Sequence, residues 1–212
     1  MTVLTRIEGV AALETELPIG VAAGAQVRTP CGPRNVENLR PGDLIVTRRD
    51  GLQPLRMIWK RTIAASEVAA DPSLAPVSFA TRAIGPLMPQ APISLAAAHR
   101  VLVPGYRLEG AEDTEPCLIR ARDLAGKSSD VALERNSGDL TLYNLVFDEH
   151  QVFAANGLPV ESFLLSPTNL CRLEEDAMAE LSEIFPDIDE DADAFSKPVY
   201  PVWDDAVSLT VA

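Results

Sequence analysis

The sequence predicts an all-β domain followed by one amphipathic helix, and three observations support this fold class. Short apolar runs alternate with turn signals, as in VALERN and TLYNLVF on either side of Ser137-Gly138. Asp50-Gly51 and Asn156-Gly157 each stand between two apolar runs, where such pairs are among the best hairpin signals. No long helical period occurs before about residue 165.

The predicted strands follow in chain order. Residues 44–47 (LIVT) and 54–60 (PLRMIWK) form the arms of a hairpin around Asp50-Gly51. The same pattern returns near the end of the domain in TLYNLVF, QVFAA and LPVESFLL. Between these two regions, five prolines from Pro72 to Pro92 interrupt regular structure, so we expect residues 70–91 to form a long excursion between strands.

After the last predicted strand the apolar period becomes helical. Ser166 suits the N-cap and Pro167 the first helical position, and Pro186 stops the helix. The apolar residues that follow the period are Leu173, Ala177, Met178, Leu181, Ile184 and Phe185. We expect this helix to pack its apolar face on the sheet domain, and a partner-binding helix is the alternative.

These elements divide the chain into four predicted parts. An N-terminal arm covers residues 1–17, and the β domain covers residues 18–166. The helix covers residues 167–186, and an acidic linker with an extended apolar tail covers residues 187–212.

Composition excludes several classes of function. The formal net charge of −13 argues against a nucleic-acid partner, which needs a basic footprint. No apolar run approaches the roughly eighteen residues of a membrane span, and acidic residues interrupt the only apolar region that could resemble a signal peptide. The three cysteines are scattered and form no disulfide framework, so the expected compartment is a reducing one, by default the cytoplasm.

Two histidines narrow the search for a catalytic base. His99 begins the apolar strand of ISLAAAHRVLV, and His150 follows Asp148 at a turn between strands. Either imidazole could act as a base for a serine or cysteine nucleophile if the fold brings them together. The alternatives are a satisfied structural imidazole for His99 and a solvated turn residue for His150.

The sequence predicts no metal and no cofactor. The acidic run from Asp187 to Asp193 resembles a calcium loop, but Ala192 occupies the glycine position and Pro198 the position of the bidentate Glu. The histidines and cysteines lack the spacing of a zinc site, and no phosphate-binding glycine loop occurs.

Several blocks of the chain, in order, resemble one known family. The opening block is GVAAGAQVRTPCGPRNVENLRPGDLIVTRRDGLQPLRMIWKR, the second ISLAAAHRVLV and the closing one YNLVFDEHQVFAANGLPVESF. Together they resemble Hint domains, the module shared by Hedgehog proteins and inteins, over about residues 18–166. The resemblance is closest to the bacterial Hint-type subfamily of α-proteobacteria, and it implies a horseshoe-like all-β fold of long curved strands.

The resemblance also implies a self-directed chemistry. In the family, the first residue, a Cys, Ser or Thr, attacks the preceding carbonyl. A Thr-x-x-His element, in which Ser can replace the Thr, polarises the amide and protonates the departing nitrogen. Inteins then use a closing His-Asn pair, whose Asn cyclises.

This chain departs from the family pattern at each of these positions. Gly20 falls on the nucleophile and Ala96 on the hydroxyl of the histidine block. Glu161-Ser162 replaces the closing His-Asn pair, an ending that is common in this subfamily, and Asn144 replaces an acid often found after the closing-block tyrosine. His99, His150 and Asp148 remain at family positions.

Three functional hypotheses follow. The first is a Hint domain that has lost self-processing and acts as a structural or protein-binding module, with a protein or peptide segment bound in a groove near His99. The second is residual autoprocessing or hydrolase activity that uses His99 with a relocated nucleophile such as Cys31 or Ser94. The third makes the 1–17 arm the functional part.

Overall fold

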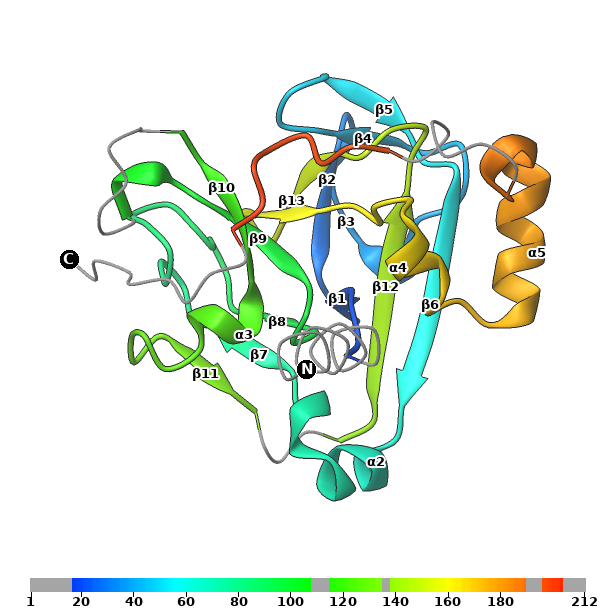
Figure 1. Ribbon diagram of the computed structural model, residues 1–212. Helices are drawn as coiled ribbons and strands as arrows, with labels where there is room; N and C mark the ends of the chain where they lie inside the picture. The colour runs from blue at the N-terminus through cyan, green and yellow to red at the C-terminus, as the bar shows by residue number, and fades with distance from the viewer. Residues whose placement is uncertain (1–16, 108–114, 135–137, 190–195, 204–212) are drawn as a thin grey trace, which may run out of the picture.

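The computed structural model describes residues 17–107, 115–134, 138–189 and 196–203 (Figure 1). Residues 1–16 are outside this range, so most of the predicted N-terminal arm lies outside the described residues. Within the described part of the chain, no helix is long and apolar enough to cross a membrane.

Two six-stranded antiparallel sheets form the body of the protein. The first has the order β11-β7-β8-β1-β12-β6. Its strands are β1 (Val21–Ala22), β6 (Met57–Ile63), β7 (Val77–Phe79), β8 (Ile93–Leu95), β11 (Val131–Leu133) and β12 (Leu140–Val146). The longest pairing joins β12 to β6 over seven residue pairs, and these two strands stand side by side in Figure 1.

The second sheet has the order β10-β9-β14-β13-β2-β3. Its strands are β2 (Gln26–Thr29), β3 (Gly32–Asn35), β9 (Arg100–Val103), β10 (Cys117–Arg120), β13 (Val152–Ala155) and β14 (Leu158–Glu161). The largest buried cluster takes side chains from both sheets, including Val21 and Leu95 of the first and Val27 and Val160 of the second. The sheets therefore share one apolar core, and the predicted all-β architecture is confirmed.

The predicted hairpin at Asn156-Gly157 is confirmed. A hairpin also forms around Asp50-Gly51, but its second arm differs from the predicted residues 54–60, because residues 57–60 belong to β6 and pair with β12. A separate two-stranded sheet pairs β4 (Leu44–Val46) with β5 (Leu52–Pro54) on either side of Asp50-Gly51. Strands β13 and β14 pair on either side of Asn156-Gly157. Asn156 and Gly157 have φ angles of 48° and 79°, which is the left-handed backbone that a two-residue hairpin turn requires.

The proline-rich stretch 70–91 contains more structure than the sequence predicts. Strand β7 lies inside it and pairs with both β8 and β11. The 3₁₀ helix η2 (Pro72–Leu74) precedes β7, and α2 (Ala65–Ala70) ends at the start of the stretch. The prediction of a long irregular excursion is therefore wrong, because the three residues of β7 fit between prolines that lie outside the paired positions.

Three further short helical elements went unpredicted. They are α3 (Ala121–Leu124), which follows β10 directly, and the 3₁₀ helices η1 (Val36–Asn38) and η3 (Gly105–Arg107). Each spans one turn, too short to carry an apolar period.

The predicted helix 167–186 is two helices, α4 (Pro167–Leu170) and α5 (Glu175–Ile184), followed by η4 (Pro186–Asp189). Ser166 caps α4 as predicted, since its side chain accepts from the Asn169 N–H. After one turn, the N–H groups of Arg172 and Leu173 bond to carbonyls three residues back. These 3₁₀ bonds end α4 and let α5 take a new direction, so the prediction of one continuous helix is wrong.

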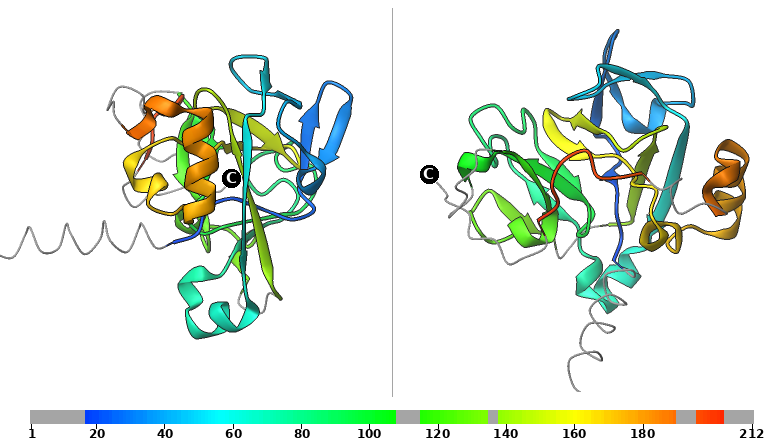
Figure 2. Two further views of the ribbon diagram at one scale, coloured as in Figure 1. Left: turned by 90° about the vertical axis from the view of Figure 1, so that its right-hand side faces the viewer. Right: turned by 45° about the horizontal axis from the view of Figure 1, so that its top comes forward.

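Helix α5 packs on β6, as the views of Figures 1 and 2 show. Leu181 is completely buried in a cluster with Met57 and Trp59 of β6. The indole N–H of Trp59 donates to the Glu174 carboxylate at 2.8 Å, which fastens the start of α5 to the strand. The apolar face of α5 therefore covers the sheet, as the sequence predicts.

The tail segment 196–203 lies along the edge strand β10. Val202 forms a parallel bridge with Leu118, and the Leu118 N–H donates to the Pro201 carbonyl at 2.8 Å. The Trp203 N–H returns a bond to the Leu118 carbonyl at 2.9 Å. The extended tail thus satisfies backbone groups that an edge strand would otherwise expose.

Candidate functional site

The segment Leu17–Val21 is inserted between β8 and β12, and its last residue pairs with both strands. The N–H groups of Ala96 and Ala98 donate to the carbonyls of Gly20 and Pro18, at 3.0 and 3.2 Å. The carbonyls of Pro18 and Gly20 flank Ile19, so these two backbone bonds hold the Ile19–Gly20 peptide bond in place.

His99 contacts the nitrogen of this peptide bond. The His99 N–H donates to the Ala96 carbonyl at 3.0 Å and closes a tight turn, which positions the imidazole ring. Its Nδ1 accepts from the Gly20 N–H at 3.2 Å, so the neutral ring carries its proton on Nε2. Nε2 is buried and has no hydrogen-bond partner among the described residues.

Burial keeps the His99 ring neutral. The side chain is 3% exposed, and desolvation lowers the pKa of His99 from 6.5 to about 4, although the charge of Glu161 opposes the shift. Arg100 and His150 add to the lowering of this pKa. At neutral pH the nitrogen that faces Gly20 is therefore a hydrogen-bond acceptor without a proton.

Asn144 contacts the other end of the same peptide bond. Its side-chain N–H donates to the Ile19 carbonyl at 3.2 Å, and the residue is 1% exposed. The amide Oδ1 has no partner in the described part of the chain. A buried donor that bonds to a carbonyl oxygen can stabilise negative charge on that oxygen. Asn144 thus contacts the carbonyl oxygen of the peptide bond, and His99 contacts its nitrogen.

Gly20 has a backbone and surroundings that disfavour a side chain. Its φ is +121°, a value that L side chains rarely adopt. A Cβ at this position would lie 2.9 Å from Asn144 Nδ2, 3.0 Å from the Tyr143 carbonyl oxygen and 3.2 Å from the Leu142 Cβ. The backbone and the neighbours of position 20 therefore both favour glycine.

His150 is buried, so the alternative of a solvated turn residue is wrong. The residue is 3% exposed; its Nδ1 accepts from the Val199 N–H at 3.1 Å, and its Nε2 lies 3.5 Å from Glu161 Oε2. Burial alone raises the pKa of Glu161, but the His150 hydrogen bond and the Arg100 charge outweigh it and lower this pKa to about 2. His150 thus connects the tail segment to a buried carboxylate.

Asp148 lies apart from both histidines. Its side chain is 52% exposed and pairs with Arg56 at 3.4 Å. A surface ion pair of this kind contributes little to stability. The structure therefore brings His99, His150 and Glu161 into one region and leaves Asp148 on the surface.

The remaining candidates of the sequence lie in other environments. Ala96 is completely buried in an apolar cluster. Cys31 is exposed in the turn between β2 and β3, and the Ser94 hydroxyl donates to Glu134 at 2.7 Å. Neither of the last two contacts the Ile19–Gly20 peptide. Among the described residues, no group of His, Cys, Asp and Glu side chains is placed to hold a metal ion.

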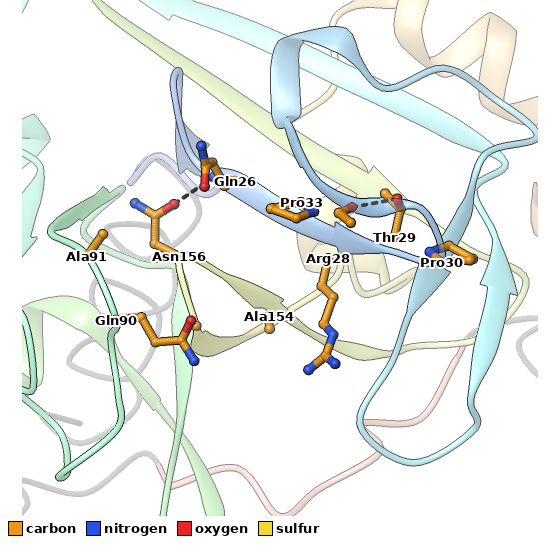
Figure 3. Close-up of a pocket in the computed structure, with 11 residues that line it drawn as sticks. Gln26, Arg28, Thr29, Pro30, Pro33, Gln90, Ala91, Ala154 and Asn156 are labelled. Atoms are coloured by element: carbon orange, nitrogen blue, oxygen red, sulfur yellow. Dashed lines mark hydrogen bonds between the residues drawn. The ribbon is translucent and has the colours of Figure 1, made fainter.

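Two cavities on the protein could correspond to the groove that the sequence predicts near His99. One of about 370 Å³ borders Ile19 and the two neighbours of His99, Ala98 and Arg100, while the His99 ring itself is buried. A larger one of about 640 Å³ lies over β2 and the β13–β14 turn (Figure 3). In the larger cavity Asn156 accepts from the Gln26 N–H at 2.7 Å, and the described residues that line it include neither a histidine nor a carboxylate. Only the smaller cavity adjoins the peptide bond.

Sequence reasoning missed the roles of Asn144 and Glu161. Asn144 was noted only as the replacement of an acid, yet it follows Leu140 and Leu142 on the buried face of β12. A polar residue at an inward position of a strand needs a partner, and that alternation is the signal that could have found it. Glu161 ends the fully buried strand β14, which is a comparable signal.

Comparison with protein families identifies the one to which the chain belongs. The sequence model of the Hint domain family matches residues 19–167. The bacterial intein-like domain from Clostridium thermocellum is 14% identical, and the match covers 69% of this chain and 100% of that one, with a TM-score of 0.43. The DnaB intein from Synechocystis sp. PCC 6803 is 12% identical over 68% of this chain and 99% of that one, also with a TM-score of 0.43. No curated protein shows significant similarity to the chain.

Proposed function

The chain belongs to the Hint domain family, and from this premise we propose that it is a non-processing member that keeps its upstream segment attached and serves as a structural or protein-binding module. Hint domains are related to self-splicing proteins, so the function depends on whether the Ile19–Gly20 peptide bond can be cleaved. The partner we expect is a protein or peptide segment.

The observation that carries the proposal is the environment of Gly20. Acyl shift needs a nucleophilic side chain next to the carbonyl that it attacks. Gly20 supplies none, and a Cβ at this position would be crowded by contacts of 2.9 to 3.2 Å and strained by the positive φ. The covalent route therefore lacks its nucleophile, and the structure around position 20 disfavours a side chain there.

The state of His99 supports the same conclusion. Release of the Gly20 nitrogen requires a proton from the imidazole nitrogen that faces it. That nitrogen accepts the Gly20 N–H, and a pKa of about 4 leaves the ring neutral at pH 7. His99 holds the amide nitrogen in place and carries no proton to give to it from Nδ1.

A second candidate function is slow hydrolysis of the Ile19–Gly20 bond. One observation favours it: Asn144 donates to the carbonyl oxygen while His99 contacts the nitrogen. Water would add to the Ile19 carbonyl carbon, the bond to the Gly20 nitrogen would break, and a carboxylic acid and an amine would result. Relocated nucleophiles at Cys31 or Ser94 have no comparable support.

Intact mass separates these two functions. Full-length protein is expected to keep the mass of residues 1–212 before and after incubation with dithiothreitol, because no thioester forms at position 20. A fragment that begins at Gly20 would overturn the proposal. If such a fragment also disappears in Asn144→Ala, with Ser94→Ala as the matched control, hydrolysis is the function.

Within the family, we place the chain in the bacterial Hint-type subfamily of α-proteobacteria on the strength of its closing block, which ends in Glu161-Ser162. All three cysteines are free, two of them exposed, which supports a reducing compartment such as the cytoplasm.

A further inference from the structure

We infer that the cavity over β2 and the β13–β14 turn binds an extended peptide segment that carries an acidic side chain (Figure 3). The cavity has a volume of about 640 Å³, which is within the usual range of ligand pockets. Neither Ile19 nor Gly20 occurs among the described residues that line it, so this site is separate from the candidate cleavage site.

Hydrogen bonds within the protein hold the frame of this cavity. The Oδ1 of Asn156 accepts from the Gln26 N–H at 2.7 Å, and its backbone carbonyl accepts from the Gln90 N–H at 2.8 Å. At the other end of the cavity, the Thr29 hydroxyl donates to the Gly32 carbonyl at 2.6 Å and closes the turn between β2 and β3. The walls are therefore formed in advance, and a ligand does not have to order them.

Three polar side chains of the lining remain open to a ligand. The guanidinium of Arg28 and the carboxamides of Gln26 and Gln90 make no hydrogen bond or ion pair with any other residue that the structure describes. A Cβ at Gly157 would lie 2.6 Å from the Gln90 Cγ, so the stem of Gln90 packs directly on this glycine. Figure 3 shows Arg28 and Gln90 on the two sides of Ala154, which leaves a small residue between two hydrogen-bonding groups.

Arg28 determines the charge of the ligand. It is the only charged residue among the described residues that line the cavity. A guanidinium binds a carboxylate with paired N–H donors. Because the net charge of the protein is −13, its overall field does not attract an anion, and the attraction has to be local. The ligand is therefore expected to place one carboxylate beside Arg28.

The spacing of side chains along β2 determines the shape of the ligand. Gln26 and Arg28 are both exposed, whereas Val27 between them is completely buried. Side chains two residues apart on a strand lie about 7 Å apart on one face, and alternate side chains of an extended peptide have the same spacing. An extended segment can therefore present an acid to Arg28 and a polar side chain to Gln26.

This inference rests on the proposed function in one respect, since only a binding module needs a partner. It names the class of partner and adds a binding surface apart from His99. A free small carboxylate and a peptide segment without an acid are the alternative ligands.

NMR titration of the ¹⁵N-labelled full chain tests the site. The probes are four peptides, acetyl-Val-Xaa-Val-Gln-amide with Glu, Asp, Gln or Lys at Xaa, because valine favours an extended chain. The Glu and Asp peptides are expected to shift the amide signals of Arg28, Ala154 and Asn156 saturably, and the Gln and Lys peptides to bind at least about tenfold more weakly. Acetate at the same concentrations is expected to leave these signals unchanged.

Two variants that each remove one positive charge separate a local contact from a general effect of charge. R28Q is expected to weaken binding of the Glu peptide about tenfold. R34Q changes an exposed arginine of the neighbouring strand β3, which pairs with Asp43 at 2.8 Å and lies outside the cavity lining. It is expected to keep the parent affinity. The NMR spectrum of each variant shows whether the chain is folded.

The inference is overturned if neither acidic peptide shifts these signals, if the Gln peptide binds as tightly as the Glu peptide, or if R28Q and R34Q weaken binding equally. Saturable binding of acetate as tight as that of the Glu peptide also overturns it, and assigns the cavity to a small carboxylate. Intact mass of the same samples separates the two proposals. Loss of residues 1–19 contradicts the proposed function, whereas full-length protein that binds no acidic peptide contradicts only this inference.

Discussion

Replacing Gly20 with alanine is expected to lower the free energy of unfolding by about 4 kcal/mol, because it adds backbone strain and overpacking at one position. The strain comes from a φ of +121°, and the overpacking from contacts as short as 2.9 Å with Asn144 and 3.0 Å with the Tyr143 carbonyl. Urea unfolding followed by tryptophan fluorescence measures the loss.

Gly32 provides the matched control for this prediction. Its φ of +104° is similar, but a Cβ there would meet nothing within 4 Å. Gly32→Ala is therefore expected to cost only the backbone strain, about 1 to 2 kcal/mol. Equal losses at the two positions would show that the space around Gly20 is not restricted.

Stability is expected to fall by about 3 kcal/mol as the pH drops from 6.5 to 4, because of His99. The folded pKa of about 4 lies below the ordinary 6.5, so the unfolded chain binds the proton first. The stabilisation is fully present above pH 6.5 and is lost as the pH falls through the folded pKa. Urea unfolding at a series of pH values measures it.

Glu161 is expected to produce a second loss, also of about 3 kcal/mol, at lower pH. Its folded pKa of about 2 lies below the ordinary 4.5. Its contribution is present above pH 4.5 and is lost as the pH falls from there toward 2.

Two variants show which residue causes each loss of stability at low pH. His99→Gln keeps an acceptor for the Gly20 N–H and removes the titration, so it should flatten the profile between pH 6.5 and 4 only. Glu161→Gln should flatten it below pH 4.5 only, at the cost of overall stability. A profile that His99→Gln leaves unchanged would contradict the buried neutral imidazole.

The fold could be predicted where local chemistry determines it. Asn156-Gly157 determines its hairpin, because a two-residue turn needs the left-handed backbone that both residues adopt. In the longer loop between β4 and β5, Gly51 supplies a left-handed residue. Strand β7 could not be predicted, since three residues carry no readable alternation and its pairing with β8 and β11 is long-range. The break between α4 and α5 follows from the 3₁₀ backbone bonds of Arg172 and Leu173, which a helical period does not show.

Some features of the candidate site could also be predicted from the sequence, and others could not. The order of the blocks that resemble the Hint family singles out both His99 and Gly20, and the structure brings these two residues into contact. The burial of His150 and the surface position of Asp148 do not, because adjacent residues of one turn face opposite environments. The bond from Asn144 to Ile19 spans 125 positions, so only the folded chain reveals it.

The central claim is that this junction is built around glycine and has not merely lost one side chain. Intact mass of the Gly20→Cys/Ala96→Thr variant tests it directly, with Gly32→Cys/Ala96→Thr as the control that carries the same number of changes. The folded fraction of the first variant is expected to keep its full length in dithiothreitol, and its folded yield should be lower than that of the control. Thiol-dependent cleavage between positions 19 and 20, in protein that folds as well as the control, would contradict the claim.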